Sequence, residues 1–109
     1  MNNILSLLDN YTQCNTNDIA TSIASDFRKR RIEKNLTREQ VAEISGISVS
    51  NIIRFEQKGL ISLKNLIGVS IALGYTSEIK NIFTSPKYST MEELTQIRKN
   101  KGKKRAYRK

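Results

Sequence analysis

The sequence predicts an all-α fold, and two observations support this class. Apolar residues recur three and four positions apart, which is the spacing of one helix face, and no stretch alternates as a strand does. Ser, Thr and Asn precede several of these segments and glycine follows them, as is usual at helix ends. The chain has 109 residues and a single proline, Pro86, which fits one helical domain with short appendages.

The first long helix is expected over residues 18–34, with several candidate caps among residues 15–18. Ile19, Ile23 and Phe27 follow one another at intervals of four. This spacing predicts that the three side chains share the face that packs into the domain.

Two short helices follow and are joined by a glycine turn. Thr37 is placed to cap the first of them, with Gln40 completing a reciprocal capping box, and Gly46 supplies the turn. Ser48 caps the second helix and Gly59 closes it. The residues expected to face inward from this pair are Val41, Ala42, Ile44, Ile52, Phe55 and Glu56.

Three further helices are expected downstream. Ser62 caps a fourth helix that ends at Gly74, a short fifth helix covers residues 79–83, and a sixth runs over residues 89–98. In the sixth, Glu92 or Glu93 completes a capping box. The inner face of the fourth helix is expected to carry Leu63, Leu66, Ile67, Ser70 and Leu73.

These segments divide the chain into three parts. Residues 1–17 form an N-terminal arm, residues 18–84 form the helical domain, and residues 85–109 form a linker, a short helix and a basic tail. The arm is compatible with a fraying end or with a helix that packs or contacts a second copy. Its apolar residues at helical spacing are Ile4, Leu7, Leu8 and Tyr11.

The net charge of +9, from 19 basic and 10 acidic residues, indicates an anionic partner, but it is unevenly distributed. Residues 98–109 carry eight basic residues and no acidic one, whereas the first 97 residues carry a net charge of only +1. Three interpretations of the tail stay open. It adds sequence-independent DNA affinity, it binds an acidic protein such as a toxin kinase, or it is a disordered, solubilising end.

Composition also excludes several functions. The single cysteine, Cys14, and the absence of histidine exclude an intramolecular disulfide and a Cys/His zinc site. No phosphate-binding loop or paired carboxylate indicates an enzyme, so neither catalysis nor a cofactor is expected. No signal peptide is expected and no apolar run is long enough to span a bilayer, so a cytoplasmic protein without membrane contact is expected.

The second helix of the pair has the properties of a helix that reads DNA. A recognition helix inserts its amino-terminal residues into the major groove while its apolar underside packs on the domain. Ser50 and Arg54 are expected to point away from the core, where Arg54 can donate two hydrogen bonds to guanine. Val49 and Ile53 can contact a thymine methyl group, unless a neighbouring segment covers Ile53.

Polar residues at helix starts and flanks are suited to phosphate contacts. Ser48 would also be explained by capping alone, and Arg38 and Lys64 by ordinary solvated surface charge. It is the combination of cap, glycine turn, apolar underside and outward polar groups that favours DNA binding. The expected phosphate-binding residues are Thr37, Arg38, Ser48, Asn51, Lys58 and Lys64.

Arg31 and Glu56 each lie on the inward row of their helix, where a lone buried charge would be costly. We therefore expect the two side chains to form an ion pair that ties the first helix to the recognition helix. Such a pair fixes helix orientation more than it adds net stability. The alternative is that both side chains reach solvent at the domain edge, in which case Arg31→Met would change neither folding nor DNA affinity.

Several spaced motifs together resemble the Xre/Cro family of helix-turn-helix repressors over roughly residues 20–75. The residues that carry the resemblance are Arg31, Leu36-Thr37-Arg38-Glu39-Gln40-Val41-Ala42, Gly46-Ile47-Ser48, Ile52, Arg54-Phe55-Glu56, Ser62-Leu63, Leu66 and Ala72-Leu73-Gly74. The resemblance implies a five-helix lambda-repressor-like domain, a homodimer and a near-palindromic operator.

The same resemblance implies roles for individual residues. Its base-reading positions fall on Val49, Ser50 and Arg54, and its phosphate-binding glutamine position falls on Arg38. Its buried arginine–glutamate pair falls on Arg31 and Glu56. Val49 departs from the family, because many members carry glutamine there, and this affects which bases are read.

The region after residue 83 is more loosely similar to HipB-like antitoxins, which are encoded beside HipA-like kinase toxins. The leading function is therefore an autoregulatory antitoxin of a toxin–antitoxin operon that binds its operator and a HipA-like kinase. The alternatives are a phage or mobile-element repressor without a toxin and a protein-binding adaptor on the same fold.

A homodimer is expected because one recognition helix reads too few bases. A two-fold dimer would bridge half-sites about 34 Å apart on one face of the DNA. Ile79, Ile82 and Phe83 are the leading dimer-contact candidates, and the apolar residues of the arm come second. Ordinary core packing would equally explain each of these residues.

Overall fold

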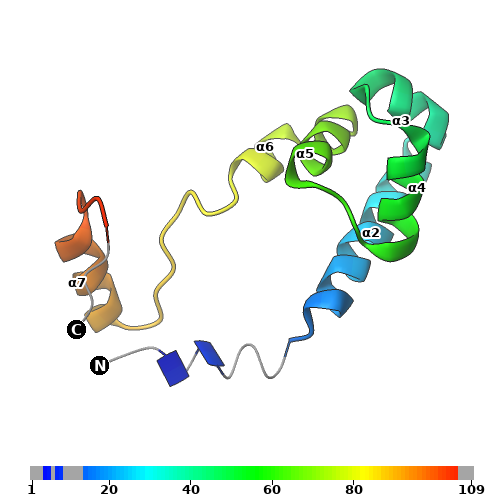
Figure 1. The fold of residues 1–109 in the computed structure, drawn as a ribbon. Coiled ribbons are helices and arrows are strands. Elements are labelled where there is room, and N and C mark those ends of the chain that lie inside the picture. Colours follow the sequence, from blue (N-terminus) through cyan, green and yellow to red (C-terminus); the bar gives the residue numbers. More distant parts are fainter. Residues whose placement is uncertain (1–3, 6, 9–13, 106–109) are drawn as a thin grey trace. The chain divides into compact units, whose positions relative to one another are not determined.

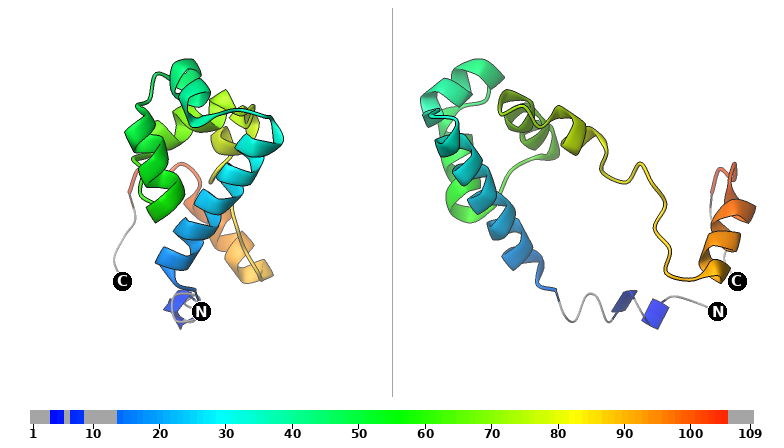
Figure 2. Two further views of the ribbon diagram at one scale, coloured as in Figure 1. Left: turned by 90° about the vertical axis from the view of Figure 1, so that its right-hand side faces the viewer. Right: turned by 180° about the vertical axis from the view of Figure 1, so that it is seen from behind.

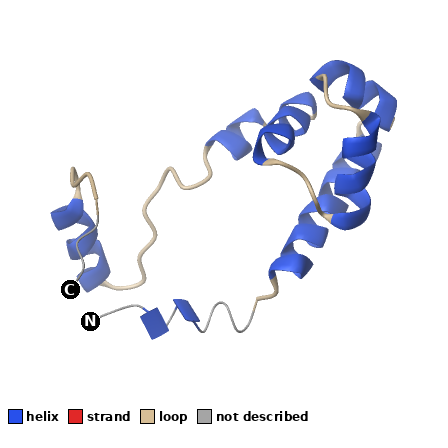
Figure 3. Ribbon diagram, viewed as in Figure 1, coloured by secondary structure: helices blue, strands red, loops and turns tan. Residues whose placement is uncertain are grey.

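The computed structural model describes residues 4–5, 7–8 and 14–105 of the chain. All regular secondary structure in these residues is helical, which confirms the all-α prediction (Figures 1 and 3). The chain divides after Lys80 into two compact units. Residues 4–5 and 7–8 are helical and exposed, whereas Tyr11, the last member of the predicted arm face, lies outside the described residues.

Helix α2 spans Thr16–Glu33 and begins at the cap residue Asn15, whose side-chain oxygen accepts the backbone N–H of Asn17 at 2.8 Å. The predicted inward row of this helix is wrong in part. Phe27 is buried, but Ile19 and Ile23 are 48% and 50% exposed. The observed inward residues instead include Ala24, Phe27 and Arg31.

The close approach of two backbones explains this shift. A Cβ atom built on Gly59 would lie 3.0 Å from the backbone carbon of Ala20. Only small residues fit on α2 where the backbone at Gly59 passes so close. The row of alanines therefore faces inward, and Ile19 and Ile23 lie at its edge.

Helices α3 (Arg38–Ser45) and α4 (Val49–Lys58) form the predicted pair. The capping box is present, because the Thr37 hydroxyl accepts the Gln40 N–H at 3.0 Å and the Gln40 side chain accepts the Thr37 N–H at 2.8 Å. Gly46 ends α3 in a left-handed conformation with φ 75°, as a sharp turn requires. The inward prediction holds at Val41, which is fully buried, and is wrong at Ile44, which is 60% exposed.

Helix α5 (Leu63–Ala72) starts after the cap Ser62. The predicted fifth helix over residues 79–83 is wrong in its bounds, because α6 covers Thr76–Lys80 and residues 81–83 form a turn. The inner row of α5 is shifted from the predicted one. Val69 and Leu73 are buried and Leu66 packs against the core, whereas Leu63 and Ile67 are 68% and 37% exposed. Positions 66, 69 and 73 keep helical spacing, so the error is a rotation of the helix.

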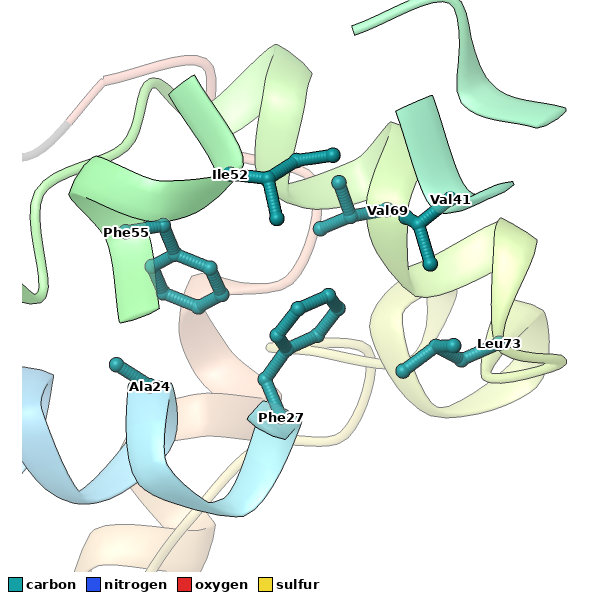
Figure 4. Close-up of a cluster of buried hydrophobic side chains, with 7 residues drawn as sticks. All are labelled: Ala24, Phe27, Val41, Ile52, Phe55, Val69 and Leu73. Carbon is teal, nitrogen blue, oxygen red and sulfur yellow. The ribbon is translucent and has the colours of Figure 1, made fainter. Parts of the chain in front are cut away.

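The core lies among α2, α3, α4 and α5, and Figure 4 shows its side chains pointing toward one another. The rings of Phe27 and Phe55 lie 5.2 Å apart at an angle of 54°, a tilted aromatic contact that joins α2 to α4. In Figure 2, α4 lies beside α2 in both views, in agreement with their contacts. The fully buried residues are Ala24, Val41, Ile52 and Val69, with Phe27, Phe55 and Leu73 nearly so.

The C-terminal unit contains α7 (Met91–Asn100), which begins at the cap Thr90. The predicted capping box with Glu92 or Glu93 is not the contact observed. The Glu93 carboxylate accepts both the backbone N–H and the hydroxyl of Ser89, at 2.9 and 3.0 Å, one residue before the cap. None of the helices in the described part of the chain has the length and apolar character needed to cross a membrane.

Candidate nucleic-acid interface

Helix α4 has one face in the core and the other in solvent. Ile52 and Phe55 are 0% and 2% exposed, and the side chain of Glu56 is 1% exposed. Ser50 and Arg54 are exposed on the opposite side. The helix can therefore approach another molecule with polar groups while its apolar side stays packed on the domain.

The other two predicted base-reading residues are partly covered. Val49 and Ile53 are half-buried, which leaves part of each aliphatic side chain accessible. Ser50 and Arg54 supply a hydroxyl and a guanidinium group, which can bond to base edges, whereas the aliphatic groups suit a methyl group.

Arg54 lies in a shallow hollow between α4 and the start of α5. The hollow has a volume of about 360 Å³ and brings Arg54 together with the predicted phosphate-binding residue Asn51. Sequence reasoning missed Asn65, which follows the Ser62 cap and lines the same hollow. The full lining is Asn51, Arg54, Leu60, Ile61, Ser62 and Asn65.

The structure places the predicted phosphate-binding residues in different settings. The hydroxyl oxygens of Thr37 and Ser48 accept backbone N–H groups at 3.0 and 3.2 Å and thus cap α3 and α4. An accepting hydroxyl still has its own O–H to donate, so capping leaves each of them able to contact a phosphate. Lys58 and Lys64 are exposed, at the end of α4 and the start of α5.

Arg31 and Glu56 lie in direct contact. Arg31 Nε donates to Glu56 Oε2 at 2.7 Å, and Arg31 Nη2 donates to Glu56 Oε1 at 3.0 Å. Arg31 Nη1 donates to the backbone oxygen of Leu36 at 2.9 Å. All three nitrogens of this guanidinium group are therefore used inside the protein, where they join α2 to α4 and to the start of α3.

Two further arginines approach the same carboxylate, and neither contact was predicted. Arg38 Nε donates to Glu56 Oε1 at 3.0 Å, and Arg28 Nε lies 3.9 Å from that oxygen. Burial raises the pKa of Glu56, but hydrogen bonds from Arg31 and Arg38 and the charges of both lower it, and the pKa lies below its usual value. Glu56 is thus held as a carboxylate among three cations.

The comparisons with known proteins agree with this geometry. Residues 27–79 match a protein-family model described as helix-turn-helix, and this range covers the last part of α2, the paired helices α3 and α4 with their turn, and α5. The match supports an Xre-type, lambda-repressor-like helix-turn-helix domain over these residues. No curated protein matches the chain. The helix-turn-helix match supports a DNA-binding transcription regulator.

The predicted dimer-contact residues lie in the sequence at the end of the helix-turn-helix match and just beyond it. Ile79 is half-buried in α6, and Ile82 is 50% exposed after the helix ends. Phe83 is 98% exposed and has a left-handed backbone with φ 65°, which is unusual for an aromatic residue. The structure thus leaves Ile82 and Phe83 accessible.

Proposed function

We propose that the chain is a sequence-specific repressor that binds a near-palindromic operator as a homodimer. The observation that carries this proposal is the division of α4, with Ile52, Phe55 and Glu56 packed inward and Ser50 and Arg54 in solvent. In the proposed complex the first turns of α4 enter the major groove. Arg54 bonds to guanine, Ser50 bonds to a neighbouring base, and Val49 and Ile53 contact thymine methyl groups.

Phosphate contacts would position the domain on the duplex. The capping residues Thr37 and Ser48 lie at the starts of α3 and α4, beside the first backbone amides of each helix. Helix starts favour anions, so a phosphate suits these positions. The residues proposed for these contacts are Thr37, Arg38, Ser48, Asn51, Lys58 and Lys64. They contribute affinity without sequence information, whereas the exposed face of α4 contributes specificity.

The dimer is proposed because two recognition helices are needed to read an operator of useful length. The accessible Ile82 and Phe83, together with Ile79, are the proposed contacts. Light scattering coupled to gel filtration tests this point on the wild type and on Phe83→Ser. The proposal expects a dimeric wild type and a weakened dimer for the variant, and a monomeric wild type at micromolar concentration would contradict it.

The narrower form of the proposal is that the chain is the autoregulatory antitoxin of a HipA-like kinase toxin. The support for it is the layout of the C-terminal unit, in which Pro86 and α7 precede a run of basic residues. Copurification with the product of the adjacent gene tests it. A kinase-like neighbour that is captured supports the antitoxin, and its absence leaves a repressor without a toxin.

Footprinting on the DNA upstream of the chain's own gene tests the proposed function itself. We expect two protected half-sites whose centres are about one helical turn, or 34 Å, apart. No protection at low salt would contradict operator binding and would favour a protein-binding adaptor on the same fold.

A further inference from the structure

The three arginines around Glu56 differ in how exposed they are and in how many guanidinium nitrogens remain available to bind another group. Arg31 has 9% of its side chain exposed and uses all three guanidinium nitrogens within the protein. Arg38 and Arg28 are 30% and 57% exposed; Arg38 Nε donates to Glu56 at 3.0 Å, whereas Arg28 Nε lies 3.9 Å from the same oxygen, within ion-pair distance. Within the described part of the chain, their terminal nitrogens make no hydrogen bond.

This arrangement has a directional consequence. An arginine held by its Nε atom has a fixed guanidinium plane, and its two terminal nitrogens point away from the anchoring carboxylate. Arg38 is held in this way, and Arg28 forms an ion pair with the same carboxylate oxygen. Guanidinium groups drawn to one point suit the oxygens of a phosphate, which takes paired N–H donors.

The surface around these arginines is hollowed. Arg28 and Arg38 line a depression of about 390 Å³ at the start of α3, together with the cap residue Thr37. Glu39 also lines it, and its negative charge opposes an anion there. The three arginines outnumber the two carboxylates, so the depression and the buried Glu56 together carry one excess positive charge.

We infer that Arg28 is an additional DNA phosphate contact beside Arg38, and that Glu56 is the positioning residue that orients the Arg38 guanidinium group and draws Arg28 toward the same phosphate. This inference rests on the proposed DNA-binding function and extends it in two respects. Glu56 acts on DNA without touching it, and α2 takes part in DNA binding through Arg28 as well as in the core through Phe27.

The two carboxylates provide a matched pair of variants, because Glu39→Gln and Glu56→Gln remove the same charge from the same region. If charge alone mattered, both would tighten DNA binding and steepen its dependence on salt. A positioning role predicts opposite effects. Glu39→Gln binds somewhat more tightly than the wild type, whereas Glu56→Gln binds roughly tenfold more weakly, equivalent to one lost charge-assisted hydrogen bond.

The measurement is fluorescence anisotropy with a 30-base-pair duplex from the gene's upstream region and a scrambled duplex of the same composition, between about 50 and 200 mM salt. For Glu56→Gln we expect a shallower salt slope on both duplexes despite its greater positive charge. Tighter binding by Glu56→Gln, matching Glu39→Gln, would overturn the positioning role. Circular dichroism establishes that each variant is folded.

Arg38→Lys covers the case in which Glu56→Gln does not fold. Lysine keeps the charge but cannot hold Glu56 through one nitrogen while offering two others to a phosphate. We expect weaker binding than wild type by a variant that circular dichroism shows to be folded, and wild-type affinity would overturn the inference.

Arg28→Ala and Lys29→Ala form the control for the phosphate contact itself. Lys29 is exposed and adjacent in sequence but does not line the depression. Arg28→Ala should lower the magnitude of the salt slope by about 0.9, the value for one phosphate contact, and Lys29→Ala should leave it unchanged. Equal slopes for the two variants would overturn the role of Arg28. Absence of wild-type binding to either duplex would overturn the proposed function together with this inference.

Discussion

Glu56 joins three helices and, in our proposal, also positions groups that bind DNA. Its carboxylate lies on α4 and accepts hydrogen bonds from Arg31 on α2 and Arg38 on α3, so it fixes three helices at one point. Removing one partner of such a buried group leaves the other uncompensated, which is more costly than the net contribution of the pair. The orientation of α4 therefore depends on a group that the solvent does not reach.

The lowered pKa of Glu56 predicts a pH dependence of stability. Because the pKa is lower in the folded chain than in the unfolded one, the contribution of Glu56 is fully present above the unfolded value of about 4.3. It is lost as the pH falls through the lower folded value. Urea unfolding should show the largest stability difference between the wild type and Glu56→Gln at neutral pH and a smaller one below about pH 4. A difference that stays constant with pH would contradict this account.

Residue-scale reasoning from the sequence could reach only part of this network. Arg31 and Glu56 could be paired because each occupies the inward row of its own helix, and an unpaired charge there is costly. Arg28 and Arg38 lie on no such row. Their approach to Glu56 depends on how the start of α3 meets the end of α4, which helical periodicity does not specify.

At the scale of elements, helix ends follow local rules and helix rotations do not. The caps Thr37, Ser48 and Ser62 each accept a backbone N–H three residues ahead, as their sequence positions predict. The inward rows of α2 and α5 were predicted with the wrong rotation, since close packing against neighbours selects Ala24 and Val69 over larger exposed residues. Neighbour spacing is a tertiary property that a single helix does not encode.

Two glycines that end α3 and α4 offer a matched test of this packing. Gly46 and Gly59 both have left-handed backbones, but a Cβ on Gly46 would meet open space, whereas one on Gly59 would press on the backbone of Ala20. Gly46→Ala should cost about 1 kcal/mol, from backbone strain alone. Gly59→Ala should cost more, and each further kcal/mol should lower the melting temperature by about 4–8 °C. Equal melting temperatures for the two variants would show that α2 and α4 are not in such close contact.

At the scale of the whole molecule, most of the net positive charge and the proposed recognition surface lie in different parts of the chain. Residues 98–109 carry eight basic residues, whereas the first 97 residues are nearly neutral. The core lies entirely between residues 24 and 73. We therefore expect folding not to require the basic end, which leaves its charge for a partner.

Truncation after Ile97 separates the interpretations of this basic end. We expect the shortened chain to keep its melting temperature and to bind DNA with a shallower salt slope, by about 0.9 for each phosphate contact that is lost. The measurement is the salt dependence of the dissociation constant on a scrambled duplex. An unchanged slope together with lost capture of a neighbouring kinase would assign the tail to protein binding.

The most direct test of the central claim is the specificity ratio, which is the affinity for the upstream DNA divided by that for a scrambled duplex. If α4 reads bases through Arg54, Arg54→Ala should lower this ratio by a factor equivalent to about 1–3 kcal/mol of binding free energy. Lys64→Ala should weaken binding to both duplexes equally and leave the ratio unchanged. Competition gel shifts on the two variants and the wild type measure it. A ratio that Arg54→Ala leaves at the wild-type value would contradict sequence reading by this helix.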